Sequence, residues 1–131
     1  MRILIDTNVL ISAFVFGGKA GKLLETLFGE HYELLVSEYV DTEFKAKLEL
    51  KWADKAQKVY ELYRTLPFSF CKSAQEKLGE LRDEKDIPVL SDALLHNVDI
   101  ILSGDKDFLE AGLEHPQVFS PAMLYDFLMK Q

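Results

Sequence analysis

Four short stretches of this chain each place an acid where a strand or helix is expected to end. They lie at residues 2–8, 40–43, 83–86 and 102–107. No cluster of histidines or cysteines accompanies these acids, and a hard cation such as Mg²⁺ or Mn²⁺ takes oxygen ligands. The pattern therefore indicates a divalent-metal site. A metal held by carboxylates in turn points towards phosphate chemistry.

Electrostatics explains why acids would be gathered in this way. Carboxylates a few ångströms apart repel one another, and in an empty cluster this repulsion raises some of their pKa values. A divalent cation removes the conflict. It could then orient a water molecule and stabilise the charge that grows on a phosphoryl oxygen.

Composition narrows the class of protein. At 131 residues we expect one domain over 1–131. A single cysteine and no recognisable signal pattern favour a reducing cytoplasm, and no apolar run approaches the ~18 residues of a membrane span. The net charge of −7 argues against a nucleic-acid binder with a broad basic face. It does not exclude a nuclease, because a bound cation reverses the local sign.

Short apolar runs alternate with amphipathic stretches along the chain. We expect strands at 2–5, 33–36, 68–71, 99–102 and 117–119, and helices at 8–16, 19–28, 37–50, 52–66, 87–96 and 121–129, with a weaker helix at 74–81. Strands separated by such helices indicate βαβ units. The predicted fold is an α/β, three-layer α/β/α sandwich around a mainly parallel sheet of four to five strands.

Such sheets bind ligands beyond the carboxyl ends of their strands. Asp6 and Asp105 follow the first and fourth expected strands. If these two strands are neighbours, their carboxylates converge within reach of one ion. Glu43, in the helix after the second strand, and Asp86, at the start of the helix before the fourth, can point into the same crevice.

Taken singly, each acid has a simpler structural explanation. Asp6 and Asp86 stand where helix N-caps are expected. Asp105 follows a glycine and could form a turn, and Glu43 could be a solvated charge on a helix surface. The metal site is therefore a prediction about the set of acids and not about any one of them.

The ordered set of motifs resembles the PIN domain family, which comprises small metal-dependent nucleases found in toxin–antitoxin pairs and in RNA-processing enzymes. The matching pieces are ILIDTNVLISA at 3–13, SEYVDTEF at 37–44, DEKD at 83–86 leading to Ala93, IILSGDKDF at 100–108 and SPAML at 120–124. They run from the first strand to the last helix in the family's order.

The resemblance implies a role for each matching acid. It makes Asp6, Glu43, Asp86 and Asp105 the catalytic metal ligands, with Asp107 as an auxiliary that reaches the metal through water. The expected cofactor is Mg²⁺ or Mn²⁺.

Supporting residues follow from the same match. Asn8 would support Asp6, and Ser103 stands where the family usually has threonine and would tie its loop by hydrogen bonding. The stretch at 72–82 looks longer than the family's connection. Asp83 and Asp92 therefore remain rivals of Asp86 for the third ligand position.

The implied function is a metal-dependent endoribonuclease, the toxin of a toxin–antitoxin pair. Its partners would be an RNA substrate, an antitoxin protein and a second copy of the chain in a homodimer, with no membrane. Five lysines are candidates to meet the RNA backbone: Lys19, Lys22, Lys45, Lys47 and Lys106.

Two other classes of function stay open. One is a non-catalytic PIN-fold module that binds RNA or protein, and the other is a metal-dependent phosphohydrolase or phospho-acceptor domain. Phosphatases of the haloacid-dehalogenase type have a second aspartate two residues after the first, whereas this chain has Asn8 at that position.

Overall fold

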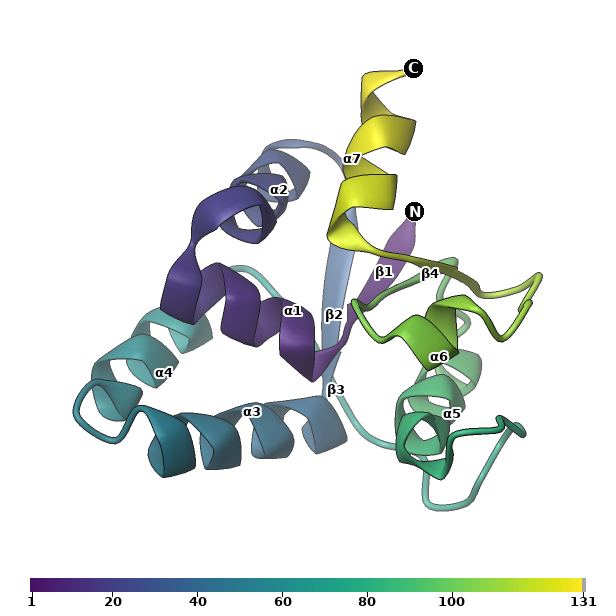
Figure 1. Cartoon of the computed structure of the whole chain (residues 1–131), viewed down its shortest axis with the longest axis horizontal. Helices are drawn as coiled ribbons and strands as arrows, with labels where there is room; N and C mark the ends of the chain where they lie inside the picture. Colours follow the sequence, from purple (N-terminus) through teal and green to yellow (C-terminus); the bar gives the residue numbers. More distant parts are fainter. Residues whose placement is uncertain (131) are drawn as a thin grey trace.

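The computed structural model describes residues 1–130 and contains one five-stranded sheet in which every pair of neighbours is parallel (Figure 1). The strand order is β3-β2-β1-β4-β5. The strands are β1 (Arg2–Ile5), β2 (Glu33–Ser37), β3 (Ser69–Cys71), β4 (Ile100–Leu102) and β5 (Gln117–Phe119). The predicted parallel sheet, with β1 beside β4, is thus confirmed.

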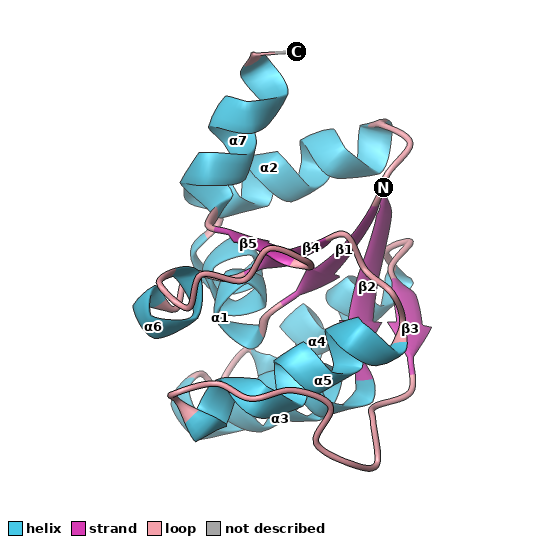
Figure 2. Cartoon of the chain, turned by 90° about the vertical axis from the view of Figure 1, so that its right-hand side faces the viewer, coloured by secondary structure: helices cyan, strands magenta, loops and turns pink. Residues whose placement is uncertain are grey.

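Helices cover both faces of the sheet, so the predicted three-layer sandwich is also confirmed. They are α1 (Thr7–Ile11), the π-helix η1 (Ser12–Phe16), α2 (Gly18–Gly29), α3 (Glu38–Lys51), α4 (Ala56–Thr65), the short 3₁₀-helix η2 (Glu84–Asp86), α5 (Ile87–Leu95), α6 (Lys106–Leu109) and α7 (Pro121–Met129). Figures 1 and 2 show α1 to α4 on one side of the sheet and α5 and α6 on the other, while α7 packs against α2.

No helix within residues 1–130 is long and apolar enough to cross a membrane.

The expected buried helix over 8–16 is only half right. Its first half is α1, which buries Val9 and Leu10. The second half is the π-helix η1, none of whose residues is buried, and Phe16 is 71% exposed. A π-helix has a wider turn than an α-helix, so successive side chains point in different directions from those expected, and this apolar run does not form one buried stripe. Gly17, with a φ of 76°, then turns the chain into α2.

The helix expected over 52–66 begins four residues later, at Ala56. Trp52 instead terminates α3, because its N–H donates to the Leu48 carbonyl oxygen at 2.8 Å. Leu62 on α4 is 60% exposed. The inward position of α4 belongs to Tyr63, which is fully buried and donates a hydrogen bond to an Asp41 carboxylate oxygen at 2.7 Å.

The weak helix expected over 74–81 is absent, and this segment is part of an irregular connection that we call the 72–83 loop. Its backbone donors are used by α5: the Ala74 N–H donates to Asp92 Oδ1 at 2.7 Å and the Leu78 N–H to Ser91 Oγ at 2.9 Å. Side-chain acceptors of this kind compete with a helix for the same N–H groups. Gly79 lies so close to α5 that a Cβ there would stand 2.7 Å from Leu90 Cδ2.

Candidate metal centre

The carboxyl ends of β1 and β4 meet at one point of the sheet edge. Ile5 pairs with Leu102, and the Asp6 N–H donates to the Leu102 carbonyl oxygen at 2.9 Å. Asp6 and Ser103 therefore leave their strands side by side, and Asp105 follows two residues later. The structure fulfils the condition under which the two strand-end aspartates were expected to converge.

Asp6 is a buried acid with both oxygens engaged. Its Oδ1 accepts from the Thr7 N–H at 2.8 Å, and its Oδ2 accepts from the Ser103 hydroxyl at 2.7 Å. Burial raises the pKa of Asp6 above its usual value, and the charges of Glu43 and Asp105 add to that rise, although the two hydrogen bonds oppose it. Asp6 is thus a helix cap, as its local sequence suggested, and also a member of a group of acids.

Asp86 is buried as well, with 6% of its surface exposed, but unlike Asp6 it does not have hydrogen bonds to both carboxylate oxygens. Burial, together with the nearby charges of Asp105, Asp6 and Asp83, raises the pKa of Asp86 to about 7. Its Oδ2 has no hydrogen-bond partner within the described residues, and its side chain makes no capping bond to α5. A buried carboxylate oxygen without a donor is costly unless a proton or a cation neutralises it.

The centre of the group consists of three aspartates. Asp83, Asp86 and Asp105 each place a carboxylate oxygen within 4.8 Å of the other two. Asp83 therefore joins Asp86 and does not replace it. Asp92 points elsewhere, since its two oxygens accept from Ser73 Oγ at 2.9 Å and from the Ala74 N–H at 2.7 Å. Of the two rivals, Asp83 lies at the site and Asp92 secures the 72–83 loop.

Glu43 approaches this centre from α3. It is half-buried, and its charge acts on both Asp6 and Tyr39. The Tyr39 hydroxyl donates to Glu43 Oε2 at 3.4 Å. Burial raises the pKa of Tyr39, and the charges of Glu43, Asp6 and Asp86 also raise it. Tyr39 precedes Glu43 by one helical turn, and this spacing brings the two side chains together.

The supporting residues fall into two groups. Ser103 is buried and holds two of the acids, because it donates to Asp6 and accepts the Asp105 N–H at 3.1 Å. Asn8 is exposed, and within residues 1–130 its side chain makes no hydrogen bond to Asp6, so the expected support for Asp6 comes from Thr7 and Ser103 instead.

Asp105 precedes and Asp107 lies within α6, a short helix that the sequence pattern did not indicate. Asp105 Oδ1 caps this helix by accepting from the N–H groups of Asp107 at 2.9 Å and Phe108 at 3.3 Å. Asp105 therefore has the turn-forming role that its local sequence suggested, and it also faces Asp86. The Asp107 side chain is exposed at the rim of the acid group.

These residues fit a divalent cation. The central donors are all carboxylate oxygens, which suit Mg²⁺ and Mn²⁺. The unpartnered Oδ2 of Asp86 is the strongest sign, because a cation would satisfy this oxygen and relieve the repulsion between the aspartates. Asp83, Asp86 and Asp105 would hold the ion, with Asp6 and Glu43 beside them. Within residues 1–130 no other group of three potential ligands meets the same spacing.

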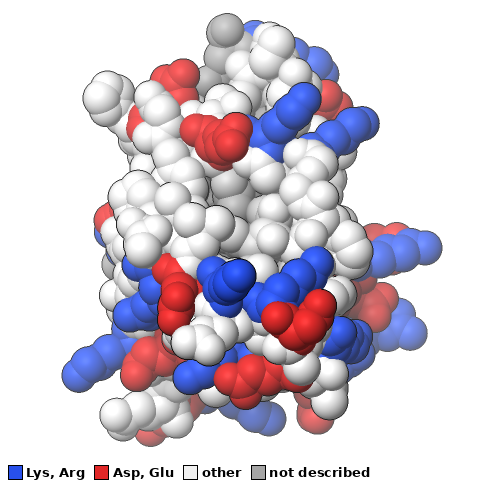
Figure 3. All heavy atoms as spheres, turned by 90° about the vertical axis from the view of Figure 1, so that its left-hand side faces the viewer, with Lys and Arg blue, Asp and Glu red and all other residues white. Residues whose placement is uncertain are grey.

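The five lysines expected to meet RNA do not form one basic surface. Lys19 and Lys22 line a groove between α2 and α7, whereas Lys45 lines a pocket between α3 and α4. Lys47 is a further residue of α3, and Lys106 lies on α6, 4.0 Å from a Glu110 oxygen. Figure 3 shows basic and acidic side chains interspersed on one face, with an uncharged band across its middle.

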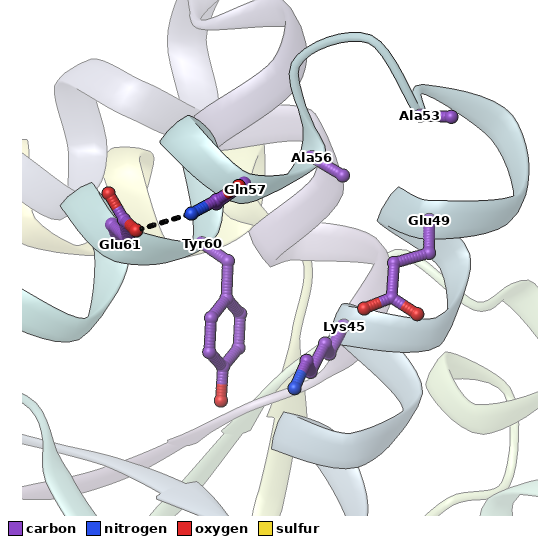
Figure 4. Close-up of a pocket in the computed structure, with 7 residues that line it drawn as sticks. All are labelled: Lys45, Glu49, Ala53, Ala56, Gln57, Tyr60 and Glu61. Atoms are coloured by element: carbon purple, nitrogen blue, oxygen red, sulfur yellow. Dashed lines mark hydrogen bonds between the residues drawn. The ribbon is translucent and has the colours of Figure 1, made fainter.

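A pocket of about 380 Å³ lies between α3 and α4 (Figure 4). The Lys45 ammonium lies 5.4 Å from the centroid of the Tyr60 ring, and the Gln57 amide donates to Glu61 at 3.1 Å. None of the expected metal ligands lines this pocket. The acid group therefore remains the candidate site.

Comparison with known proteins places the chain in a family. The family model described as "PIN domain" matches residues 2–107, and the chain therefore belongs to the PIN domain family. No curated protein matches the chain. The fold is similar to that of a chain in the crystal structure of VapBC2 from Rickettsia felis bound to a DNA fragment from their promoter, with a TM-score of 0.72 and 16% sequence identity. That match covers 92% of this chain and 98% of the other, and at this identity it shows a shared fold alone.

Proposed function

We propose that this protein is a divalent-metal-dependent endoribonuclease that hydrolyses RNA phosphodiester bonds. The observation that carries the proposal is the unpartnered, buried Oδ2 of Asp86 within a group of aspartates at the carboxyl edge of a PIN-domain sheet. Asp6, Glu43, Asp86 and Asp105 are the proposed catalytic residues, with Asp83 as an additional ligand.

The cation, Mg²⁺ or Mn²⁺, would supply positive charge for the phosphoryl oxygen and make water a better nucleophile. In the proposed reaction one water molecule adds to phosphorus, the bond from phosphorus to O3′ breaks, and the water proton ends on the leaving oxygen. The products are a 5′-phosphate and a 3′-hydroxyl. Ser103 fixes the rotamer of Asp6, and Tyr39 orients Glu43 by its hydrogen bond.

We further propose that the protein is the toxin of a toxin–antitoxin pair, acting in the cytoplasm as a homodimer. The likeness of fold to a chain of VapBC2 supports this role. The antitoxin would be a protein that covers the acid group and prevents RNA from reaching it. Co-expression with the product of a neighbouring gene, followed by purification of the complex, tests this part separately.

The substitution Asp6→Asn tests catalysis. Asparagine keeps an acceptor for the Thr7 N–H and a polar group for Ser103, so the fold should survive while the charge is lost. We expect the variant to lose at least a hundredfold in the rate of Mn²⁺-dependent cleavage of single-stranded RNA, in line with the loss of one charged group that stabilises the transition state. Circular dichroism should be unchanged.

The matched control is Asp54→Asn, which removes the same charge from an exposed position in the turn between α3 and α4. This control should cleave RNA at the wild-type rate. Metal-dependent cleavage that persists undiminished in Asp6→Asn would refute the assignment of the site.

A further inference from the structure

A cavity of about 360 Å³ opens beside the acid group, and we call it the α6 cavity. One wall is the end of the 72–83 loop, and the other is α6 with the turn that follows it. Figures 1 and 2 both show α6 beside this end of the loop. Asp83 and Asp86 are among the residues that line the cavity, so its occupant would touch the proposed metal centre. Its volume lies in the range of small-ligand sites, roughly 300–1,000 Å³.

The α6 cavity contains one basic side chain, that of Arg82. Arg82 is exposed and makes no ion pair within the described residues, although acids surround it. Lys85, the nearest lysine in sequence, does not line the cavity and lies 4.0 Å from Asp83. An arginine presents a planar fork of N–H donors that matches two oxygens of a phosphate. Arg82 is thus available to an anion that enters the cavity.

Other parts of the lining suit a nucleobase. Leu81 and Leu113 line the cavity while packing against the hydrophobic core, so they offer fixed apolar surface. Glu80 and Glu110 also line it, and neither belongs to the group of aspartates at the metal centre. Carboxylates accept hydrogen bonds from the amino groups of bases. Adenine, cytosine and guanine carry such an amino group, and uracil does not.

We propose that the α6 cavity binds the RNA nucleotide that carries the scissile phosphate, with Arg82 on that phosphate, the base between Leu81 and Leu113, and an amino group of the base on Glu80 or Glu110. This inference rests on the proposed ribonuclease function and adds a substrate subsite to it. The subsite selects amino-bearing bases over uracil, and it makes Arg82 a substrate-binding residue next to the metal ligands.

Binding of 5′-mononucleotides tests the proposal without reference to turnover, because these molecules contain no phosphodiester bond to cleave. Isothermal titration with AMP, CMP, GMP, UMP and inorganic phosphate would be performed in the presence of Mn²⁺. We expect the wild type to bind the three amino-bearing nucleotides more tightly than UMP, and all nucleotides more tightly than inorganic phosphate. Loss of a charged hydrogen bond predicts that Arg82→Ala weakens AMP binding about tenfold or more.

Two further variants make the test specific. Lys77→Ala removes the same charge from an exposed position of the same loop that does not line the α6 cavity, and it should bind AMP as the wild type does. Arg82→Lys keeps the charge but loses the planar fork, and its affinity for AMP should fall between those of wild type and Arg82→Ala. Unchanged thermal unfolding of the variants would show that the fold is kept.

Either of two results would overturn the subsite: equal AMP affinity in wild type and Arg82→Ala, or wild-type binding of inorganic phosphate as tight as that of AMP. RNA cleavage by the wild type, measured separately, keeps the two proposals apart. A wild type that cleaves RNA while Arg82→Ala binds AMP normally rejects the subsite alone. A wild type that selects nucleotides as expected but does not cleave RNA rejects catalysis and supports the cavity as a binding site.

Discussion

Two buried aspartates at and within α5 show how the same residue type can serve stability or a site. Asp92 is 1% exposed, and both of its oxygens accept hydrogen bonds from the 72–83 loop. Asp86 is 6% exposed, and its Oδ2 accepts none. A polar group that is buried and satisfied stabilises the fold, whereas one that is buried and unsatisfied destabilises it. The difference supports the proposal that Asp86, and not Asp92, serves at the metal site.

A pH dependence of the metal-free protein follows from Asp86. Its pKa is raised to about 7 in the folded state, against 3.8 for an unperturbed aspartate. Between these values the folded state holds a proton that the unfolded state has released, so stability falls as the pH rises through this window. We expect the Tm in EDTA to fall from pH 4.5 to pH 8. Thermal unfolding followed by circular dichroism measures it.

The variant Asp86→Asn should reduce that fall and raise the Tm at pH 8, since it removes the charge. Asp6, whose pKa burial also raises, keeps part of the dependence. The matched variant Asp92→Asn should act in the opposite direction. It should lower the Tm and reduce the free energy of unfolding by about 1 kcal/mol, because one acceptor for the loop is lost. A Tm that is flat between pH 4.5 and pH 8 in the wild type would contradict the high pKa of Asp86.

Strands and helix starts that depend on neighbouring residues could be predicted from the sequence. The five strands are short apolar runs, and Ser37 and Ser120 cap α3 and α7 by accepting the N–H groups of Val40 and Met123. Segments governed by distant partners could not be predicted in this way. The 72–83 loop is irregular because its N–H groups bond to side chains of α5, and no pattern within the loop reveals those partners.

The close packing of this loop on α5 gives a prediction at Gly79. A Cβ there would lie 2.7 Å from Leu90 Cδ2, and 3.2 Å from Leu94 Cδ1, so Gly79→Ala must displace the loop or the leucines. We expect a loss of about 1–3 kcal/mol in the free energy of unfolding, the usual cost of overpacking. Chemical denaturation measures it, and limited proteolysis should show earlier cleavage of the loop.

The control for this prediction is Gly29→Ala at the end of α2, where a Cβ meets nothing within 4 Å. That variant should be neutral or slightly stabilising, because alanine favours a helix more than glycine does. Because the loop also carries Asp83, Gly79→Ala should weaken Mn²⁺ binding as well. If Gly79→Ala matched Gly29→Ala in stability, the close contact between the loop and α5 would be wrong.

For the whole molecule, sheet topology explains which site residues were predictable. Asp6 and Asp105 follow strands that a parallel α/β sheet brings together, so their meeting could be deduced from strand order. Asp83 could not be placed, because its position depends on the path of the 72–83 loop across α5. The contact of Tyr39 with Glu43 is indicated in the sequence only by their spacing of one helical turn. Only part of the site can therefore be predicted from local sequence.

The acids of the group repel one another when they are ionised, and a bound cation would relieve that repulsion, so metal should stabilise the entire molecule. A ligand that binds only the folded state adds RT ln(1 + [L]/Kd) to stability, about 2.7 kcal/mol at a hundredfold excess over Kd. We expect the wild-type Tm to rise steadily with Mn²⁺, and the rise to be larger at pH 8 than at pH 6, because the proton on Asp86 competes with the metal. Asp105→Asn should abolish most of the rise, and Asp54→Asn, outside the group, should keep it. A wild-type Tm that does not respond to Mn²⁺ at pH 8 would mean that the acids are structural, and the metal-dependent reaction would have to be abandoned with them.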